Sequence, residues 1–114
     1  MHPDKREQET IDFLQRMRSA IESGRFIYLD KRSDHQYNYE TMVELQYTLK
    51  DVYDEFMSLT PKERWNGPMP DNNGNRGNFW EFKRIIDGRM IYMKVMEANF
   101  GGNFVAYSFH FDRR

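Results

Sequence analysis

Residues 79–111 read FWEFKRIIDGRMIYMKVMEANFGGNFVAYSFHF, and this stretch decides the fold. Runs rich in aromatic and β-branched residues predict three β-strands, over residues 79–86, 90–98 and 103–111. The Asp-Gly dipeptide at 87–88 is typical of a tight hairpin turn, and Gly-Gly at 101–102 supplies a second turn. The stretch therefore predicts an antiparallel β-meander.

The sequence before the meander predicts helices. Apolar residues recur at three- and four-residue steps over residues 7–23, which indicates an amphipathic helix that ends at Gly24. Residues 25–29 (RFIYL) predict a short strand. Three helix-start signals follow, at Asn38 or Tyr39, at a capping box of Thr48 and Asp51, and at Thr60, Pro61 and Glu63. Residues 66–78, rich in Asn, Gly and Pro, predict a long mobile loop.

The length of 114 residues is that of one domain, so we expect a single domain over residues 1–114. Its parts are a helical part over about 7–65, a loop over 66–78 and a β-meander over 79–112. The fold class that this order predicts is α+β, with N-terminal helices packed on a small antiparallel sheet.

Composition excludes some classes of site. The chain has no cysteine, so disulfides and thiolate metal sites are excluded. Neither a secretory signal nor an apolar run of membrane-spanning length is apparent, and we expect a cytoplasmic protein with no membrane partner. The charge is uneven: residues 1–60 carry 8 basic and 12 acidic residues, and residues 61–114 carry 9 basic and 6 acidic residues. Either the second half presents an RNA-facing surface or the charge is ordinary scatter.

Side chains alternate between the two faces of a strand, so each predicted strand has one apolar face that packs on the helices. The apolar faces comprise Trp80 and Phe82, then Ile91, Met93 and Val95, then Val105, Tyr107, Phe109 and Phe111. The opposite face gathers Glu81, Lys83, Tyr92, Lys94, Ser108 and His110. Any solvated sheet face shows such alternation, and a pair such as Glu81 with Lys94 can be merely stabilising. The presence of a phenol and an imidazole beside lysines favours a catalytic face.

Cleavage of RNA by attack of the ribose 2′-hydroxyl needs a base, an acid and groups that hold the phosphate. An imidazole titrates near neutrality, so His110 suits the role of acid or base. Tyr92 can donate a proton or hold a phosphate oxygen, but serves as a base only if nearby lysines lower its pKa. The expected phosphate-holding cations are Lys83, Lys94 and, from the strand edge, Arg84. This chemistry requires neither metal nor cofactor, and no spacing suggests a zinc site at His35 and His110.

Several segments resemble the MqsR family of toxins. They are Leu59-Thr60-Pro61 followed by Gly67-Pro68, Phe79-Trp80-Glu81-Phe82-Lys83, Gly88 through Lys94, and Ser108-Phe109-His110. The order of predicted elements is also similar to that of the family. The likeness covers about residues 10–112, and its specific motifs lie within 59–111.

The resemblance implies a RelE-like ribonuclease toxin fold and metal-independent cleavage of mRNA. It also implies a type II toxin-antitoxin system, in which a cognate antitoxin neutralises the toxin. The family's sheet tyrosine falls on Tyr92 and its late basic position on His110. Where the family often has a basic residue before Gly-Pro, this chain has Asn66, with Lys62 and Arg64 one turn earlier as candidates for RNA binding. Glu81 stands where some members have an amide, and acts as a third catalytic group if it serves as a base.

A second hypothesis keeps the fold without the chemistry. A catalytically silent RelE-like protein-interaction module, encoded by a phage or mobile element, would show the same pattern. Trp65 is likewise open to two interpretations, as a structural anchor or as a platform on which an RNA base stacks. The sequence leaves the oligomeric state open.

Overall fold

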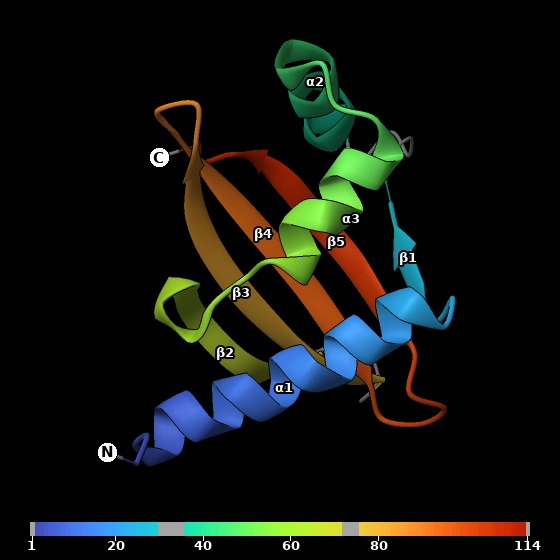
Figure 1. Cartoon of the computed structure of the whole chain (residues 1–114). Coiled ribbons are helices and arrows are strands. Elements are labelled where there is room, and N and C mark those ends of the chain that lie inside the picture. Colours follow the sequence, from blue (N-terminus) through green and yellow to red (C-terminus); the bar gives the residue numbers. More distant parts are fainter. Residues whose placement is uncertain (1, 30–35, 72–75, 114) are drawn as a thin grey trace.

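The computed structural model describes residues 2–29, 36–71 and 76–113. In chain order the elements are α1 (Lys5–Glu22), β1 (Phe26–Tyr28), α2 (Gln36–Leu45), α3 (Leu49–Met57), the 3-10 helix η2 (Pro61–Glu63), β2 (Arg64–Pro70), β3 (Gly77–Ile86), β4 (Arg89–Ala98) and β5 (Phe104–Phe111). The strands form one sheet in the order β1-β5-β4-β3-β2. Figure 1 shows α1 and α3 lying across one face of this sheet. The predicted α+β class is confirmed.

Local capping explains where the predicted helices begin. Asp4 accepts a hydrogen bond from the backbone N–H of Glu7 at 2.7 Å, so α1 starts ahead of the predicted residue 7. The capping box of α3 is present as predicted: the Thr48 N–H donates to Asp51 at 2.8 Å, and the Asp51 N–H donates to the Thr48 hydroxyl. The start signal at Thr60 produces only the short η2 turn, because Arg64 already adopts extended geometry.

The sheet differs from the prediction in two ways. It is mixed, because β1 pairs with β5 in parallel while the other pairs are antiparallel. The expected loop over 66–78 also fails in part, since its first residues belong to β2, which pairs with β3. Pro68 and Pro70 suggested a loop, but β2 is an edge strand, where a missing N–H is tolerated. Residues 72–75 of the predicted loop lie outside the described residues.

The core lies between the sheet and the helices α1 and α3. Phe13 of α1 stacks on Trp80 of β3 with ring centroids 4.1 Å apart, and Phe56 of α3 contacts Phe109 of β5. The fully buried large side chains are Phe13, Phe56, Phe82, Phe104, Phe109, Leu14, Met17, Leu59, Ile91, Met93, Val52 and Val95. Burial of these side chains holds β3, β4 and β5 as one rigid platform.

A β-bulge interrupts β5. Lys94 pairs with Ser108, but the next residue, Val95, pairs with Ala106, so Tyr107 has no opposite residue on β4. The extra residue reverses the alternation of side chains: Ala106 is buried, whereas Val105 and Tyr107 are only partly buried. The prediction that Val105 and Tyr107 lie on the core face is therefore wrong, because strict alternation does not anticipate an inserted residue.

The bulge is anchored by Asn38 of α2, whose side chain is fully buried. Its amide nitrogen donates to the carbonyls of Leu29 and Tyr107, each at 2.8 Å. Its amide oxygen accepts from the N–H of Phe109 at 3.0 Å. Since β1 pairs only with residues 104–106, α2 supplies the hydrogen bonds that β1 does not give to this part of β5.

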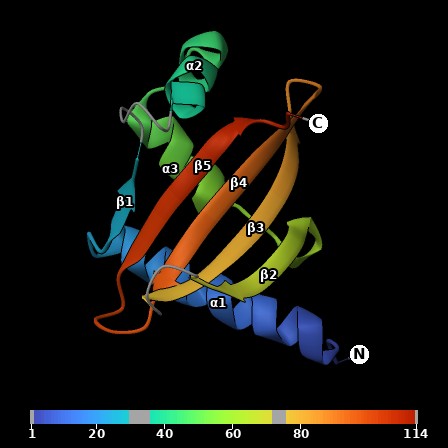
Figure 2. The same cartoon turned by 180° about the vertical axis from the view of Figure 1, so that it is seen from behind.

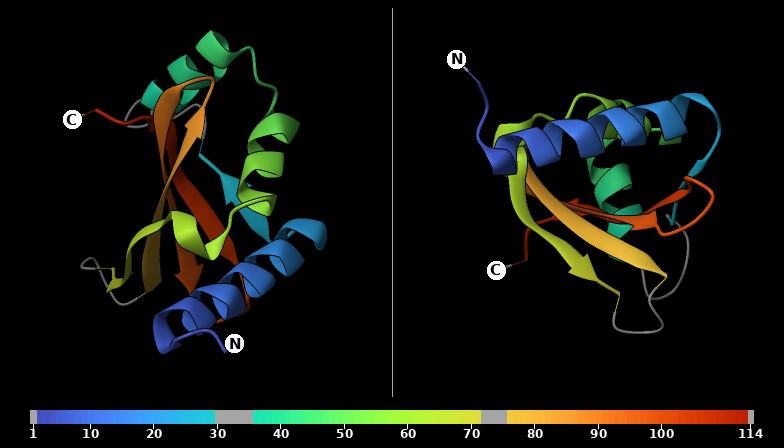
Figure 3. Two further views of the ribbon diagram at one scale, coloured as in Figure 1. Left: turned by 60° about the vertical axis from the view of Figure 1, so that its left-hand side comes forward. Right: turned by 90° about the horizontal axis from the view of Figure 1, so that it is seen from below.

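Within the described parts of the chain, no helix lies across the second face of the sheet. Figure 2 shows the strands from this side, with α1 and α3 behind them and α2 beyond the end of β1, and the right-hand view of Figure 3 shows α1 on one side of the sheet. We call this face the open face. No helix among the described residues has both the length and the apolar character needed to cross a membrane.

Candidate functional site

Two rows of polar side chains cross the open face. In the first, Lys83 of β3, Tyr92 of β4 and His110 of β5 are paired in register. In the second row Glu81, Lys94 and Ser108 are paired in the same way. The bulge lies on the far side of Ser108 from His110, so it does not disturb this alignment. The structure thus brings together the six side chains that strand alternation predicted on one face.

Tyr92 occupies the centre of the first row. Its hydroxyl donates a hydrogen bond to a carboxylate oxygen of Glu81, and its ring lies 5.4 Å from the His110 ring, centroid to centroid. Burial raises the pKa of Tyr92 above its usual value, and the hydrogen bond and negative charge of Glu81 raise it further. The lysines therefore do not make Tyr92 a base. It is a protonated hydrogen-bond donor.

The imidazole of His110 is fixed by a backbone contact. Nδ1 lies 3.0 Å from the carbonyl oxygen of Phe111. A carbonyl oxygen can only accept, so Nδ1 carries the proton in this contact, and in the neutral ring Nε2 is left with the lone pair. The Tyr37 ring of α2 also packs edge-on against the imidazole, with ring centroids 6.1 Å apart. When the ring of His110 is neutral, the contact with Phe111 leaves Nε2 as the acceptor nitrogen, which is the arrangement that a general base requires.

The two lysines are held differently. Lys83 Nζ lies 3.0 Å from Oδ2 of Asp112 and 3.9 Å from the centroid of the Trp65 ring. Lys94 Nζ lies 4.2 Å from the centroid of the Phe79 ring. Among the described residues, no carboxylate lies within ion-pair distance of Lys94. Lys94 is therefore the cation more readily available to a phosphate.

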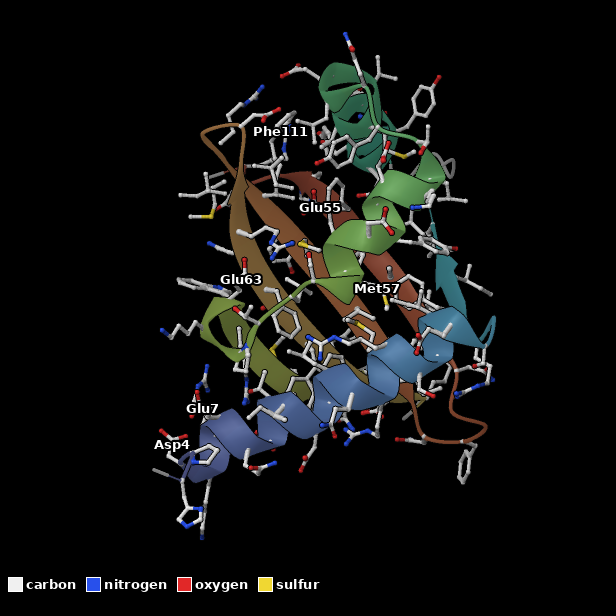
Figure 4. All side chains as sticks on the ribbon, viewed as in Figure 1. Asp4, Glu7, Glu55, Met57, Glu63 and Phe111 are labelled. Atoms are coloured by element: carbon white, nitrogen blue, oxygen red, sulfur yellow. The ribbon has the colours of Figure 1, made fainter. Side chains whose placement is uncertain are left out.

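Arg84 does not join this cluster. It follows Lys83 in β3, so its side chain points to the helical side, where it pairs with Glu55 and Glu63 at 2.8 Å each. Figure 4 shows these two carboxylates on that side, Glu55 on α3 and Glu63 on η2. Burial opposes ionisation of Glu63, but its hydrogen bonds with Arg84 and Thr60 outweigh this and lower its pKa. Arg84 therefore ties the helices to the sheet.

The basic residues that precede Asn66 are also remote from the polar rows. The Arg64 side chain is only 5% exposed, pairs with Glu9 of α1 at 2.9 Å and lies over the Trp80 ring. Lys62 is exposed on η2, beside a shallow pocket that it shares with Asp4 and Glu7 near the start of α1. The structure thus separates these two residues from Tyr92 and His110.

The open face contains residues that the sequence reasoning missed. Phe79 precedes Glu81 by two positions and Asp112 follows His110 by two, so alternation carried to the strand ends would have found both. The alternation of side chains could not predict Tyr107 on this face, because its position depends on the bulge. Its ring contacts Phe79, with centroids 5.2 Å apart and planes at 77°.

The site is an open surface. The cavity beside His110, lined also by Tyr37, Thr41 and Phe111, has a volume of about 90 Å³. Pockets that enclose small molecules are usually ~300 Å³ or larger, so a nucleotide would lie on the face and not within this cavity. Within the described ranges, no three His, Asp or Glu side chains are grouped so that they could hold a metal ion. His35 lies outside those ranges.

Comparison with known proteins gives no relative. No protein-family model, curated protein or solved structure matches this chain.

Proposed function

We propose that the protein is an endoribonuclease that cleaves mRNA without a metal ion and acts as the toxin of a type II toxin-antitoxin system. The observation that carries the proposal is the row formed by Lys83, Tyr92 and His110 on an uncovered sheet face, with the phenol and imidazole rings 5.4 Å apart. A hydrogen-bond donor, a base and a cation are the groups that internal cleavage of RNA needs.

In the proposed reaction His110 carries the proton. Nε2 takes the proton of the 2′-hydroxyl, and the 2′-oxygen forms a bond to the neighbouring phosphorus. The bond from phosphorus to the 5′-oxygen breaks, and the imidazolium returns the proton to that oxygen directly or through one water. The products are a 2′,3′-cyclic phosphate and a 5′-hydroxyl, and His110 ends in its starting form.

Tyr92 would stabilise the charge that builds on the scissile phosphate, and Lys94 would offset the negative charge of Glu81 beside it. Since the phenol has a raised pKa, Tyr92 remains protonated and donates a hydrogen bond to a phosphate oxygen in place of Glu81. Lys94 is opposite Glu81 in register, so its ammonium offsets the repulsion between that carboxylate and the phosphate. Glu81 thus orients Tyr92 before RNA binds.

The partner and the location follow from the MqsR resemblance of residues 59–111. We propose mRNA as the substrate, a cognate antitoxin as the inhibitor and the cytoplasm as the place of action. An antitoxin that covered the open face would block Tyr92 and His110 together.

Cleavage of a single-stranded RNA in the presence of EDTA tests the chemistry. We expect His110→Ala to lower the cleavage rate by about 10²–10⁴-fold and Tyr92→Phe by about 10²-fold. His2→Ala and Tyr39→Phe serve as matched controls, because both residues are exposed and neither belongs to the sheet. If the His110→Ala and Tyr92→Phe variants kept their fold and cleaved RNA at the wild-type rate, the mechanism would be refuted.

One observation favours the silent interaction module as the second candidate. The Tyr92 hydroxyl and the Lys83 ammonium are both engaged by carboxylates, those of Glu81 and Asp112. A module with these groups permanently paired would cleave no RNA and would not arrest growth when expressed. The toxin proposal instead predicts growth arrest that His110→Ala abolishes.

A further inference from the structure

Two aromatic rings on the open face each lie under a lysine ammonium. Lys94 lies over Phe79 and Lys83 over Trp65, at 4.2 and 3.9 Å from the ring centroids. A ring beside a cation matches the two parts of a nucleotide, because the base stacks on the ring and the phosphate pairs with the cation. The pair at Lys94 has further features that the other lacks.

The first feature is a second ring at the same place. Tyr107 contacts Phe79 nearly at right angles, with centroids 5.2 Å apart. Tyr107 reaches the open face only because of the bulge, which the buried Asn38 fixes through three hydrogen bonds. Bulges near functional sites commonly redirect a side chain in this way.

The second feature is the burial of Met96 beside Phe79. Met96 pairs in register with Phe79 and is only 6% exposed, although it belongs to the open face. Phe79 and Tyr107 themselves are partly exposed. A base that contacts them would meet a preorganised surface, so little side-chain entropy would be lost on binding.

We propose that Phe79, Tyr107 and Lys94 form a nucleotide subsite for single-stranded RNA. The base stacks on one of the two rings and contacts the other with its edge, since the rings are nearly perpendicular, and Lys94 moves from above Phe79 to hold the adjoining phosphate. The inference rests on the proposed function and narrows its substrate to unpaired RNA, since the bases of a duplex are not free to stack on side chains.

The subsite lies directly beside the proposed catalytic row. Lys94 and Tyr92 are two residues apart on β4, which separates them by about 7 Å along the strand. A phosphate on Lys94 would therefore be the neighbour of the phosphate at Tyr92 and His110. Lys83 is less suited to this role, because its ammonium is paired with Asp112 and must exchange that partner for the phosphate.

RNA binding to a cleavage-defective protein tests the subsite. The full chain carrying His110→Ala is titrated into a short fluorescein-labelled single-stranded RNA, and anisotropy gives the Kd. We expect Phe79→Leu or Tyr107→Leu to weaken binding by about fivefold or more, since stacking contributes ~1–3 kcal/mol per base. Leucine retains the apolar volume that covers Met96, so the fold should persist, and circular dichroism and thermal melting check this.

Phe100→Leu is the matched control, because Phe100 is 87% exposed in the β4–β5 turn. A duplex RNA of the same sequence is the second control, and its affinity should not change with Phe79→Leu. Unchanged single-strand affinity in both ring variants, or no RNA binding at all, overturns the subsite. If the rings govern binding but the wild-type protein cleaves no RNA, the proposed function fails and the subsite stands.

Discussion

Tyr92 shows how its surroundings decide what a residue can do. A phenol beside two lysines can become a base, but burial and the Glu81 carboxylate raise the Tyr92 pKa. The neighbour that matters is thus Glu81, which accepts the hydrogen bond of the Tyr92 hydroxyl and directs that hydroxyl toward the second row. The orientation of the His110 ring is likewise set by the contact of its Nδ1 with the Phe111 carbonyl.

The raised pKa of Tyr92 predicts a loss of stability in alkali. Below about pH 10, the usual phenol pKa, the hydroxyl is protonated in both folded and unfolded protein and its favourable contacts are retained. Above that pH the unfolded state loses its proton first, so the free energy of unfolding falls as pH rises toward the folded pKa. Urea titrations of wild type and Tyr92→Phe measure this fall.

The variant should lose less stability than wild type as the pH rises above about 10, because it has no hydroxyl to ionise at position 92. Tyr47, whose pKa is raised by burial and by Glu55, gives part of the alkaline loss in both proteins. The free energy of unfolding should therefore fall with pH in both proteins, but less steeply in the variant. If stability fell equally steeply with pH in wild type and Tyr92→Phe, the Tyr92 hydroxyl would have the same pKa in the folded and unfolded states.

Among the elements, β5 has one part that the sequence predicts and one part that it does not. Strand positions, the hairpin at 87–88 and the pairing of Tyr92 with His110 follow from composition and alternation. The bulge at Tyr107 does not, because it depends on Asn38, which is remote in sequence. The parallel pairing of β1 with β5 is also not predictable from the sequence, because a short apolar run does not show which distant strand it pairs with.

Asn38 predicts a coupled effect on stability and RNA binding. Asn38→Ala leaves the Tyr107 carbonyl and the Phe109 N–H without their partner, which should lower the free energy of unfolding by about 3 kcal/mol. The Tyr107 ring should also lose its fixed position, so affinity for single-stranded RNA should fall in the His110→Ala background. Urea unfolding and anisotropy measure the two effects.

Thr41→Val is the control for this effect, because its hydroxyl also contacts β5 but at Phe111, beyond the bulge. Thr41→Val should lower the free energy of unfolding but weaken RNA binding less than Asn38→Ala does. If Asn38→Ala lowered stability while leaving RNA affinity unchanged, the bulge would be a structural feature only.

In the whole molecule, part of the basic charge of the second half is paired with carboxylates on the helical side of the sheet. Arg84 and Arg64, two of the predicted RNA-binding cations, pair with Glu55, Glu63 and Glu9 on the helical side. The positive balance of residues 61–114 therefore does not translate into a strongly basic open face. A net charge of −1 is compatible with RNA binding only if few phosphates are contacted and stacking supplies much of the affinity.

This distribution predicts a weak dependence of RNA affinity on salt. If Lys94 and Lys83 neutralise about two phosphates, log Ka should fall with log salt concentration at a slope of about −1.4, since single strands contribute ~0.7 per phosphate. Lys94→Ala should reduce the slope to about −0.7. The control Lys50→Ala removes an α3 lysine that pairs with Asp54, and should leave the slope unchanged. A wild-type slope steeper than about −3 would require more cations than the two rows supply and would place the RNA on another surface.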